Sequence, residues 1–286
     1  MLDPKDWISE RQTAGTILGL KVTKWLVRRK TKYQMLELAL TEEYGLAFAL
    51  DGCFMLTERD EFFYHEMLVH PALLSLPEPG SVLVVGGGDG GALREVLKHP
   101  SVKRAVLVEI DEEVVKAAQK HLASVHQGSF YDERAQVVIS PGEEYVKRWE
   151  AEFDAIIVDS TDPVGPGRRL FEPEFFASCR RALKDKGVMA LQAGTPFHHP
   201  EELTSTLLTL GKLFGAVKPY LGFVPTYPSG MWAYILTGTQ RIEFDKDLIE
   251  RRYRERNLQT RYYTPELHFA AFVLPRFVQE MVEKAL

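Results

Sequence analysis

The stretch that decides the fold is Ser81-Val-Leu-Val-Val-Gly-Gly-Gly-Asp-Gly-Gly91, where a short apolar run leads into a glycine-rich loop. The run has no polar alternation, which is typical of a strand buried on both faces of a sheet. Gly86, Gly88 and Gly91 have the G-x-G-x-x-G spacing that lets a strand turn tightly into a helix beside a ligand. The stretch therefore predicts the first strand, loop and helix of a ligand-binding α/β sheet.

After this stretch, short apolar segments alternate with helical ones. We predict strands at 82–85, 105–108, 135–139, 155–158 and 188–192, and helices at 92–98, 112–121, 142–149, 173–183 and 201–213. This order is typical of a mostly parallel sheet covered on both faces. Residues 216–224 and 231–237 are separated only by a Pro/Gly-rich loop, so we expect a late antiparallel pair. The predicted fold is methyltransferase-like (Rossmann-like) rather than dinucleotide-binding.

The chain before residue 61 has a different periodicity. Apolar and polar side chains alternate with period two in residues 18–22, 36–40 and 46–50, which predicts a small antiparallel sheet. Helical spacing begins at residue 61. We therefore predict an N-terminal β-strand domain over residues 1–60 and an α/β catalytic domain over residues 61–286. The charge-rich stretch 251–261 is expected to be a solvated helix face.

Composition excludes several classes of protein. The chain has 286 residues, 45% hydrophobic and 26% charged, which is the balance of an ordinary globular protein. The net charge of −5 argues against nucleic acid as a partner and is compatible with a cationic ligand. The two cysteines, Cys53 and Cys179, form neither a disulfide framework nor a zinc motif. With no signal peptide and no apolar run long enough to span a bilayer, we expect a cytoplasmic protein that does not bind membranes.

Asp89, inside the glycine-rich loop, indicates the charge of the ligand. A pyrophosphate cofactor would be repelled by a carboxylate at this helix start. A sulfonium or ammonium group would be attracted by about 3 kcal/mol at ~5 Å in an effective dielectric near 20. Asp89 therefore favours a sulfonium nucleoside over NAD, and it can cap the following helix at the same time.

Other acidic residues follow the predicted strands and converge on the same rim. Glu109 lies about 20 residues beyond the loop, where an acidic side chain binds ribose hydroxyls, while Asp111 fits the N-cap of the next helix. Asp159 and Asp162 follow the fourth strand. Carboxylates that converge repel one another unless a cation lies among them. That cation is either a metal, since carboxylates alone can hold Mg²⁺, or an organic polycation. The histidines have no metal-binding spacing for zinc, so we favour an organic polycation and predict no metal site.

These segments together resemble the spermidine synthase family of polyamine aminopropyltransferases. The resemblance covers nearly the whole chain and rests on Tyr33-Gln34, 50–52, 60–66, 86–91, 109–111, 159–166, 225–230 and 262–275. It implies transfer of an aminopropyl group from decarboxylated S-adenosylmethionine to an amine, usually putrescine, giving spermidine and methylthioadenosine. It also implies a homodimer or homotetramer. Decarboxylated S-adenosylmethionine is a co-substrate, and no cofactor is expected because a sulfonium is already a good leaving group.

The resemblance assigns roles to individual residues. Asp159 would accept the proton of the attacking amine. The remaining assignments are Asp162 and Tyr227 for the acceptor amine, Tyr64, His65 and Asp89 around the aminopropyl chain and the attacking nitrogen, and Gln34, Glu109, Pro166 and the backbone of Pro141 and Gly142 for the methylthioadenosine part.

Three positions depart from the family pattern, and they bear on which acceptor amine the protein uses. Pro141 replaces an Asp that contacts adenine, Met55 replaces a frequent Gln, and Gly194 replaces an acidic residue near the amine. The acceptor could therefore be cadaverine, agmatine or a triamine. A small-amine methyltransferase would not need Asp162, and a binding protein without turnover would not need Asp159. A NAD dehydrogenase is the weakest alternative.

Overall fold

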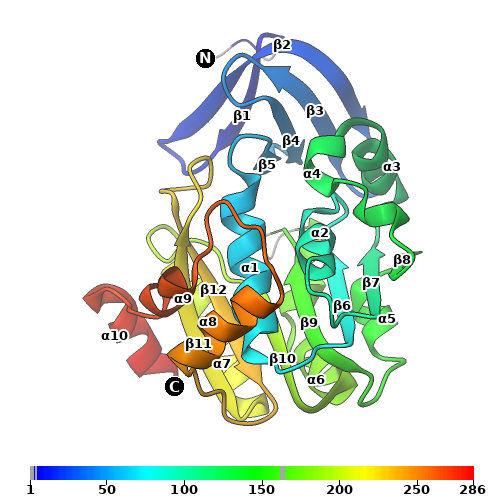
Figure 1. Cartoon of the computed structure of the whole chain (residues 1–286). Coiled ribbons are helices and arrows are strands. Elements are labelled where there is room, and N and C mark those ends of the chain that lie inside the picture. Colours follow the sequence, from blue (N-terminus) through cyan, green and yellow to red (C-terminus); the bar gives the residue numbers. More distant parts are fainter. Residues whose placement is uncertain (1–2, 4, 162–164) are drawn as a thin grey trace.

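The computed structural model describes residue 3, residues 5–161 and residues 165–286. The chain forms a small N-terminal sheet, blue in Figure 1, and a larger sheet, with α1 (Glu61–Ser75) running from the first along the second. The predicted fold class is confirmed, because the larger sheet is mostly parallel and the smaller one is antiparallel.

The N-terminal sheet is antiparallel, with its strands in chain order. These strands are β1 (Trp7–Arg11), β2 (Ile17–Lys30), β3 (Met35–Thr41), β4 (Leu46–Leu50) and β5 (Cys53–Thr57). The alternation predicted for 36–40 holds at Leu36 and Leu38, which are fully buried, but it breaks at the next pair, where Ala39 is buried and Leu40 is exposed. Neighbouring residues of β4 enter different cores: Phe48 and Leu50 join the large core, and Ala47 and Ala49 join a smaller cluster with Ile8 and Phe54.

In the larger sheet the strand order is β11-β12-β10-β9-β6-β7-β8. Its strands are β6 (Ser81–Gly86), β7 (Arg104–Glu109), β8 (Ala135–Ile139), β9 (Phe153–Asp159), β10 (Leu183–Gln192), β11 (Ala216–Phe223) and β12 (Met231–Gly238). The predicted late antiparallel pair is confirmed, because β12 runs antiparallel to both β10 and β11. The register pairs Gly86 with Asp159, so the carboxyl ends of β6 and β9 are level.

Helices cover both faces of this sheet. They are α2 (Gly91–Leu97), α3 (Glu112–His121), α4 (Ala123–His126), α5 (Gly142–Val146), α6 (Pro173–Ala182), α7 (Pro200–Leu213), α8 (Lys246–Glu255), α9 (Pro265–Ala271) and α10 (Arg276–Ala285), with 3₁₀ turns η1 (Ser129–Tyr131) and η2 (Gly165–Phe171). No helix in the described ranges is both long and apolar enough to cross a membrane.

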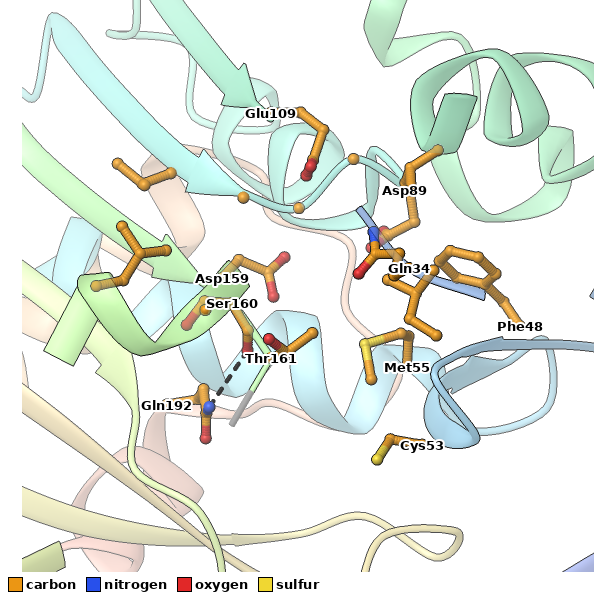
Figure 2. Close-up of a pocket in the computed structure, with 18 of the residues that line it drawn as sticks. Gln34, Phe48, Cys53, Met55, Asp89, Glu109, Asp159, Ser160, Thr161 and Gln192 are labelled. Carbon is orange, nitrogen blue, oxygen red and sulfur yellow. Dashed lines mark hydrogen bonds between the residues drawn. The ribbon is translucent and has the colours of Figure 1, made fainter. Parts of the chain in front are cut away.

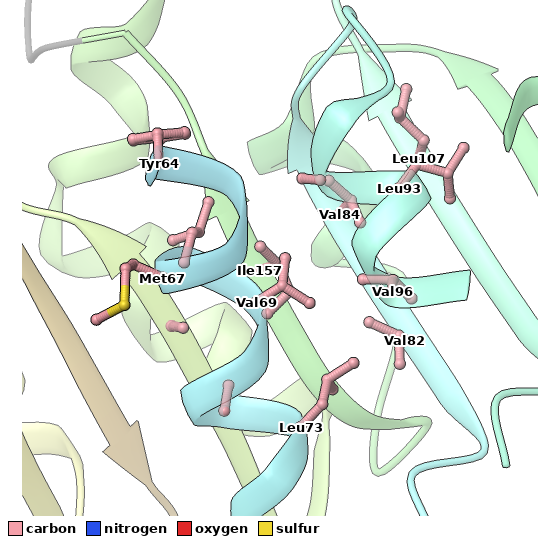
Figure 3. Close-up of a cluster of buried hydrophobic side chains, with 14 of the residues drawn as sticks. Tyr64, Met67, Val69, Leu73, Val82, Val84, Leu93, Val96, Leu107 and Ile157 are labelled. Atoms are coloured by element: carbon pink, nitrogen blue, oxygen red, sulfur yellow. The ribbon is translucent and has the colours of Figure 1, made fainter. Parts of the chain in front are cut away.

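Alternate residues of each central strand pack against opposite layers of helices. Val82, Val84 and Ile157 face α1 and α2, where Val69, Leu73, Leu93 and Val96 meet them (Figure 3). Leu83, Val85 and Ile156 face the other way, toward α5, α6 and α7. Each fully buried side chain of this kind contributes roughly 1.5–3 kcal/mol, so the two cores hold the carboxyl rim of the sheet in place.

The C-terminal stretch 251–261 is mostly exposed or half-buried, as predicted for a solvated face, but Arg256 and Leu258 are buried. Figure 1 shows α8, in orange, beside the lower end of α1. Arg256 is 9% exposed and donates to the carbonyl oxygens of Leu73, Leu76 and Pro77. The last carbonyl groups of a helix have no partner within it, so guanidinium groups can cap them. A charge-rich sequence alone does not reveal which arginines turn inward in this way.

Candidate active site

A cavity of about 320 Å³ lies at the carboxyl ends of β6, β7 and β9 and is closed on its other side by the N-terminal sheet. In Figure 2 the side chains of Glu109 and Asp159 enter it from the large sheet, opposite Cys53 and Met55 of the small sheet. The carboxyl ends of parallel strands are where ligands bind in open α/β sheets. Both sheets therefore build the candidate site.

The glycine-rich loop allows acidic side chains to lie close to the backbone. Gly87 has φ +66°, and a Cβ there would lie 2.8 Å from Oδ2 of Asp159. A Cβ on Gly91 would lie 2.3 Å from Cε1 of His65. Gly90 holds the N-cap position of α2, and Asp89, one residue earlier, accepts a hydrogen bond from the Gly91 backbone N–H at 2.7 Å while lining the cavity. Any larger residue at Gly87 or Gly91 would displace the groups that face the cavity.

Asp159, at the end of β9, has one oxygen engaged and one oxygen without a partner. The hydroxyl of Tyr64 donates to Oδ1 at 2.8 Å. Oδ2 is buried and has no hydrogen-bond partner among the described residues. Burial and then the negative charge of Asp89 raise the pKa of Asp159 to about 6. This carboxylate can therefore accept a proton near neutral pH.

His65 lies among three carboxylates. Its Nδ1 is 2.7 Å from Oε2 of Glu61, and its Nε2 is 3.3 Å from Oδ1 of Asp89 and 4.0 Å from Oδ2 of Asp159. Burial opposes a charge on the ring, but Asp89 and Glu61 outweigh burial and raise the pKa of His65 to about 10. The cavity therefore contains a cation of its own beside Asp89 and Asp159.

The same cluster has the spacing of a small cation site. Atoms of His65, Asp89 and Asp159 lie within 4.8 Å of one another. A metal would need a free lone pair on the ring. Nδ1 hydrogen-bonds to Glu61 and Nε2 lies 3.3 Å from Asp89, and the raised pKa of His65 favours a ring that carries a proton on both nitrogens and has no lone pair for a metal.

At the other end of the cavity, the acidic groups are bonded to the protein itself. Glu109 accepts a hydrogen bond from the Asp111 backbone N–H at 2.9 Å, and burial raises the pKa of Glu109 to about 7. Asp111 accepts from the Glu113 N–H, which confirms it as the N-cap of α3. Gln34 donates to Asp111 at 3.3 Å and lines the cavity near Glu109. These residues form a polar end of the cavity whose hydrogen bonds are already made within the protein.

Tyr227 lies where the loop after β11 meets α1. Its hydroxyl donates to the carbonyl oxygen of Met55 at 2.5 Å, and its ring lies 5.6 Å from that of Tyr64. Asp60 anchors this loop, because its Oδ2 accepts from both the N–H and the hydroxyl of Thr226. Tyr227 therefore joins the two sheets and lines the cavity.

Of the other residues predicted for the site, one lines the cavity, one lies outside its lining, and two are not fully described. Gly142 lines the cavity, whereas Pro141 takes the N-cap position of α5 and is not part of the lining. Asp162 lies outside the described residues. Pro166 falls within η2, and its side chain is likewise outside what the structure describes.

Several lining residues were missed in the sequence. Ser160, Thr161 and Gln192 follow or end strands of the large sheet, so the rule that ligands bind at the carboxyl ends could have found them. Gln192 donates to the Ser160 carbonyl oxygen at 3.2 Å (Figure 2). Glu10 and Trp232 carried no such signal, because only the packing of the two sheets brings β1 and the start of β12 to the cavity.

Comparisons with known proteins define the class. Residues 61–246 match the family described as "Spermine/spermidine synthase domain", and residues 6–58 match "Spermidine synthase tetramerisation domain". A "Polyamine aminopropyltransferase" of Bacillus subtilis (strain 168) is 42% identical over 277 residues, covering 97% of this chain and 99% of the relative. Another from Caldicellulosiruptor saccharolyticus is 41% identical, covering 99% of this chain and 100% of the relative.

Solved structures give the same result. A crystal structure of spermidine synthase from Thermotoga maritima is 40% identical with a TM-score of 0.90, covering 97% of this chain and 94% of that one. A spermidine synthase in complex with the transition-state analogue AdoDATO is 41% identical with a TM-score of 0.94, covering 97% and 95%. The chain belongs to the spermidine synthase family, whose members are polyamine aminopropyltransferases. It is an alkyl-group transferase, as the resemblance in the sequence implied.

Proposed function

We propose that the chain transfers the aminopropyl group of decarboxylated S-adenosylmethionine to putrescine, giving spermidine and methylthioadenosine. The observation that carries this proposal is the buried Oδ2 of Asp159, which faces the cavity without a partner among the described residues. Asp89 lies beside it, and the polar end at Glu109 lies within the same cavity. A proton acceptor, a second anion and a ribose-binding end are what the two cationic substrates require.

The reaction is a displacement at carbon. A neutral amine nitrogen of putrescine attacks the methylene carbon bonded to the sulfonium, a C–N bond forms, and the C–S bond breaks with its electron pair moving to sulfur. The nitrogen then gives a proton to Asp159. An alkylamine with a pKa near 10.4 is mostly protonated at neutral pH, so a carboxylate that accepts the proton assists the attack. Sulfur leaves as the neutral thioether of methylthioadenosine.

The proposed roles follow the position of each side chain. Tyr64 orients Asp159, and Asp89 attracts the aminopropyl ammonium group. Glu109 accepts hydrogen bonds from the ribose, with Gln34 and Gly142 beside the nucleoside. We keep Tyr227 and Asp162 as binders of the acceptor amine, and Pro141 and Pro166 as contacts of the methylthioadenosine part, on the strength of the family resemblance.

The test is a product analysis. The purified chain is incubated with decarboxylated S-adenosylmethionine and, in turn, putrescine, cadaverine, agmatine and spermidine, and the products are identified by mass. We expect methylthioadenosine and spermidine in equal amounts, with putrescine giving the highest kcat/KM. Release of methylthioadenosine with another amine preferred would overturn putrescine as acceptor. No aminopropylated product with any amine, or methylation by S-adenosylmethionine, would overturn the reaction.

Assembly and location complete the proposal. We propose that residues 1–60 form the assembly domain of a homodimer or homotetramer and that residues 61–286 form the catalytic domain. The match of residues 6–58 to a tetramerisation domain supports this. We also propose a cytoplasmic location, because the chain has only two cysteines in 286 residues, which suggests a reducing compartment.

A further inference from the structure

Behind His65 lies a buried ion pair that the proposed reaction does not use. Glu61, on α1, and Arg94, on α2, are 5% and 6% exposed. The guanidinium group of Arg94 donates to both oxygens of Glu61, at 3.0 and 2.9 Å. A two-pronged contact of this kind holds a carboxylate in one orientation. Glu61 is therefore held with Oε2 directed at Nδ1 of His65, 2.7 Å away.

The positions of the hydrogen-bond acceptors define the protonation of the ring. Nδ1 of His65 faces Glu61, and Nε2 faces Asp89. A neutral imidazole donates from only one nitrogen, whereas an imidazolium donates from both. Nδ1 hydrogen-bonds to Glu61, and Nε2 lies 3.3 Å from Oδ1 of Asp89. A neutral ring that donates from Nδ1 would direct a lone pair at that carboxylate, whereas a ring with two protons directs an N–H and a positive charge at it.

The charged groups around His65 come from every element packed against it. Glu61 belongs to its own helix, Asp89 and Arg94 come from the loop and helix after β6, and Asp159 comes from the end of β9. Arg94 reaches the ring only through Glu61, since its guanidinium group is engaged by Glu61 and Glu95. Three carboxylates thus face one ring.

We propose that Glu61, held by Arg94, is a positioning residue that keeps His65 as a fixed imidazolium between Asp89 and Asp159. This inference rests on the proposed aminopropyl transfer. The fixed cation compensates the two cavity carboxylates when no substrate is bound. It also disfavours a second positive charge nearby, so the amine nitrogen that approaches Asp159 gives up its proton more easily.

Substitution of Glu61 by Gln separates charge from shape. The amide oxygen of Gln can keep the place of Oε2 between Arg94 and Nδ1 of His65, but the negative charge that stabilises the charged ring is gone. The shape of the side chain is kept, and the pKa of His65 should fall so that the ring loses its charge near neutral pH. We expect kcat at pH 7.5 to fall about tenfold, because the amine keeps its proton more tightly. The amine KM should stay equal or fall, since the cavity has become more negative. Damage to the fold would raise KM or lower the active fraction.

The direct measurement is NMR of histidine labelled with ¹³C at Cε1, in the protein without substrate. The His65 signal is assigned by its absence in His65→Asn. In the wild type we expect no titration of this signal below about pH 9, and in Glu61→Gln we expect titration within about pH 6–8. Because this readout needs no turnover, it is independent of the reaction. A wild type that fails to transfer aminopropyl groups would overturn the proposed function and leave the charge state of His65 measurable.

Glu66→Gln is the matched control. Glu66 lies on the same helix and is 1% exposed, but its carboxylate accepts hydrogen bonds from the backbone N–H groups of residues 261–263. We expect the His65 signal in this variant to behave as in the wild type. The proposal is overturned if the assigned His65 signal titrates below about pH 9 in the wild type. It is also overturned if Glu61→Gln leaves the titration unchanged, or if Glu66→Gln shifts it equally.

Discussion

At the end of the cavity formed by β7, the acidic groups are bonded to the protein's own backbone, whereas at the end formed by α1 and β9 one carboxylate oxygen has no partner among the described residues. Glu109 accepts from the Asp111 N–H, and Asp111 accepts from Thr31, Gln34 and the Glu113 N–H. Within the described residues, Asp159 accepts a hydrogen bond from the hydroxyl of Tyr64 alone, and its Oδ2 has no partner. The acidic groups at the β7 end therefore have their hydrogen bonds before substrate binds, whereas Oδ2 of Asp159 at the other end does not, within the described residues.

This difference separates binding from catalysis. A complete polar end makes the same contacts with its ligand before and during the reaction, so it lowers the free energies of the bound and transition states alike. An unsatisfied buried carboxylate gains most when a proton is transferred to it, which happens only as the new bond forms. Substitutions at the two ends should therefore separate into effects on KM and effects on kcat.

The largest effect is expected from Asp159→Asn. The amide keeps the size of the side chain but cannot accept the proton, so kcat should fall by about 10²–10⁴. Higher pH should restore part of the rate because solution then supplies neutral amine. Steady-state kinetics from pH 7 to about 10 measure both effects.

Asp154→Asn is the control, because Asp154 lies on the same strand away from the cavity and accepts from the N–H groups of Gly80 and Ser81. Its loss should lower the free energy of unfolding and leave kcat near the wild-type value. A folded Asp159→Asn variant with wild-type kcat would show that the proton goes elsewhere.

A smaller effect, on affinity, is expected from Glu109→Gln. Ribose hydroxyls donate to an ionised carboxylate, and burial raises the pKa of Glu109 to about 7 in the protein without ligand. As the pH falls below about 7, Glu109 is protonated and must lose that proton to accept both hydroxyls. Methylthioadenosine should therefore bind more weakly at pH 6 than at pH 8. In Glu109→Gln, affinity should fall about tenfold at pH 8, with most of kcat retained and little dependence on pH.

Calorimetry with methylthioadenosine at the two pH values measures this. Glu112→Gln is the matched control, because Glu112 lies in the next helix and pairs with the exposed Lys116. It should bind as the wild type does at both pH values. If Glu109→Gln kept the donor KM and lost kcat instead, the division between the two ends of the cavity would be wrong.

Local signals in the sequence predicted the residues that lie at strand ends, on both sides of the cavity. The glycine-rich loop, Asp89, Glu109 and Asp159 all lie at strand ends, and the order of strands and helices alone brings such ends to one rim. The same signals placed Asp111 at a helix N-cap. These features depend on periodicity and on residues near each other along the chain.

Contacts between segments that are distant in the sequence depend on packing and could not be predicted from the residues alone. That Glu61 and Arg94 meet requires α1 and α2 to lie side by side, and their contact reaches His65 through one carboxylate. Glu10 reaches the cavity from β1, and Arg256 caps α1 from the far end of the chain. Nothing in the spacing of these residues indicates their partners, because helix-to-helix and sheet-to-sheet packing determines them.

The smallest effect is expected from Tyr64→Phe, which alters the end of the cavity formed by α1 and β9 without removing a charge. The hydroxyl of Tyr64 stabilises the ionised form of Asp159, and this opposes burial and Asp89, which raise the pKa of Asp159 to about 6. Loss of one such hydrogen bond should raise that pKa further, by about one unit for a contribution near 1.4 kcal/mol. Since Asp159 must be ionised to accept a proton, the acidic limb of kcat/KM should move to higher pH. The rate should fall about threefold near pH 6.5 and approach the wild-type value by about pH 9.

Tyr234→Phe is the control for this last change. Tyr234 is fully buried, its ring lies 5.8 Å from that of Tyr64, and its hydroxyl has no hydrogen-bond partner within the described part of the chain. Its removal should leave the acidic limb in place, since no bond to Asp159 is lost. If Tyr64→Phe reduced kcat/KM by the same factor at every pH, the hydroxyl would act by orienting Asp159 or the substrate and not through its charge. The end of the cavity formed by α1 and β9 would then resemble the end formed by β7, because contacts present before the reaction begins would organise both.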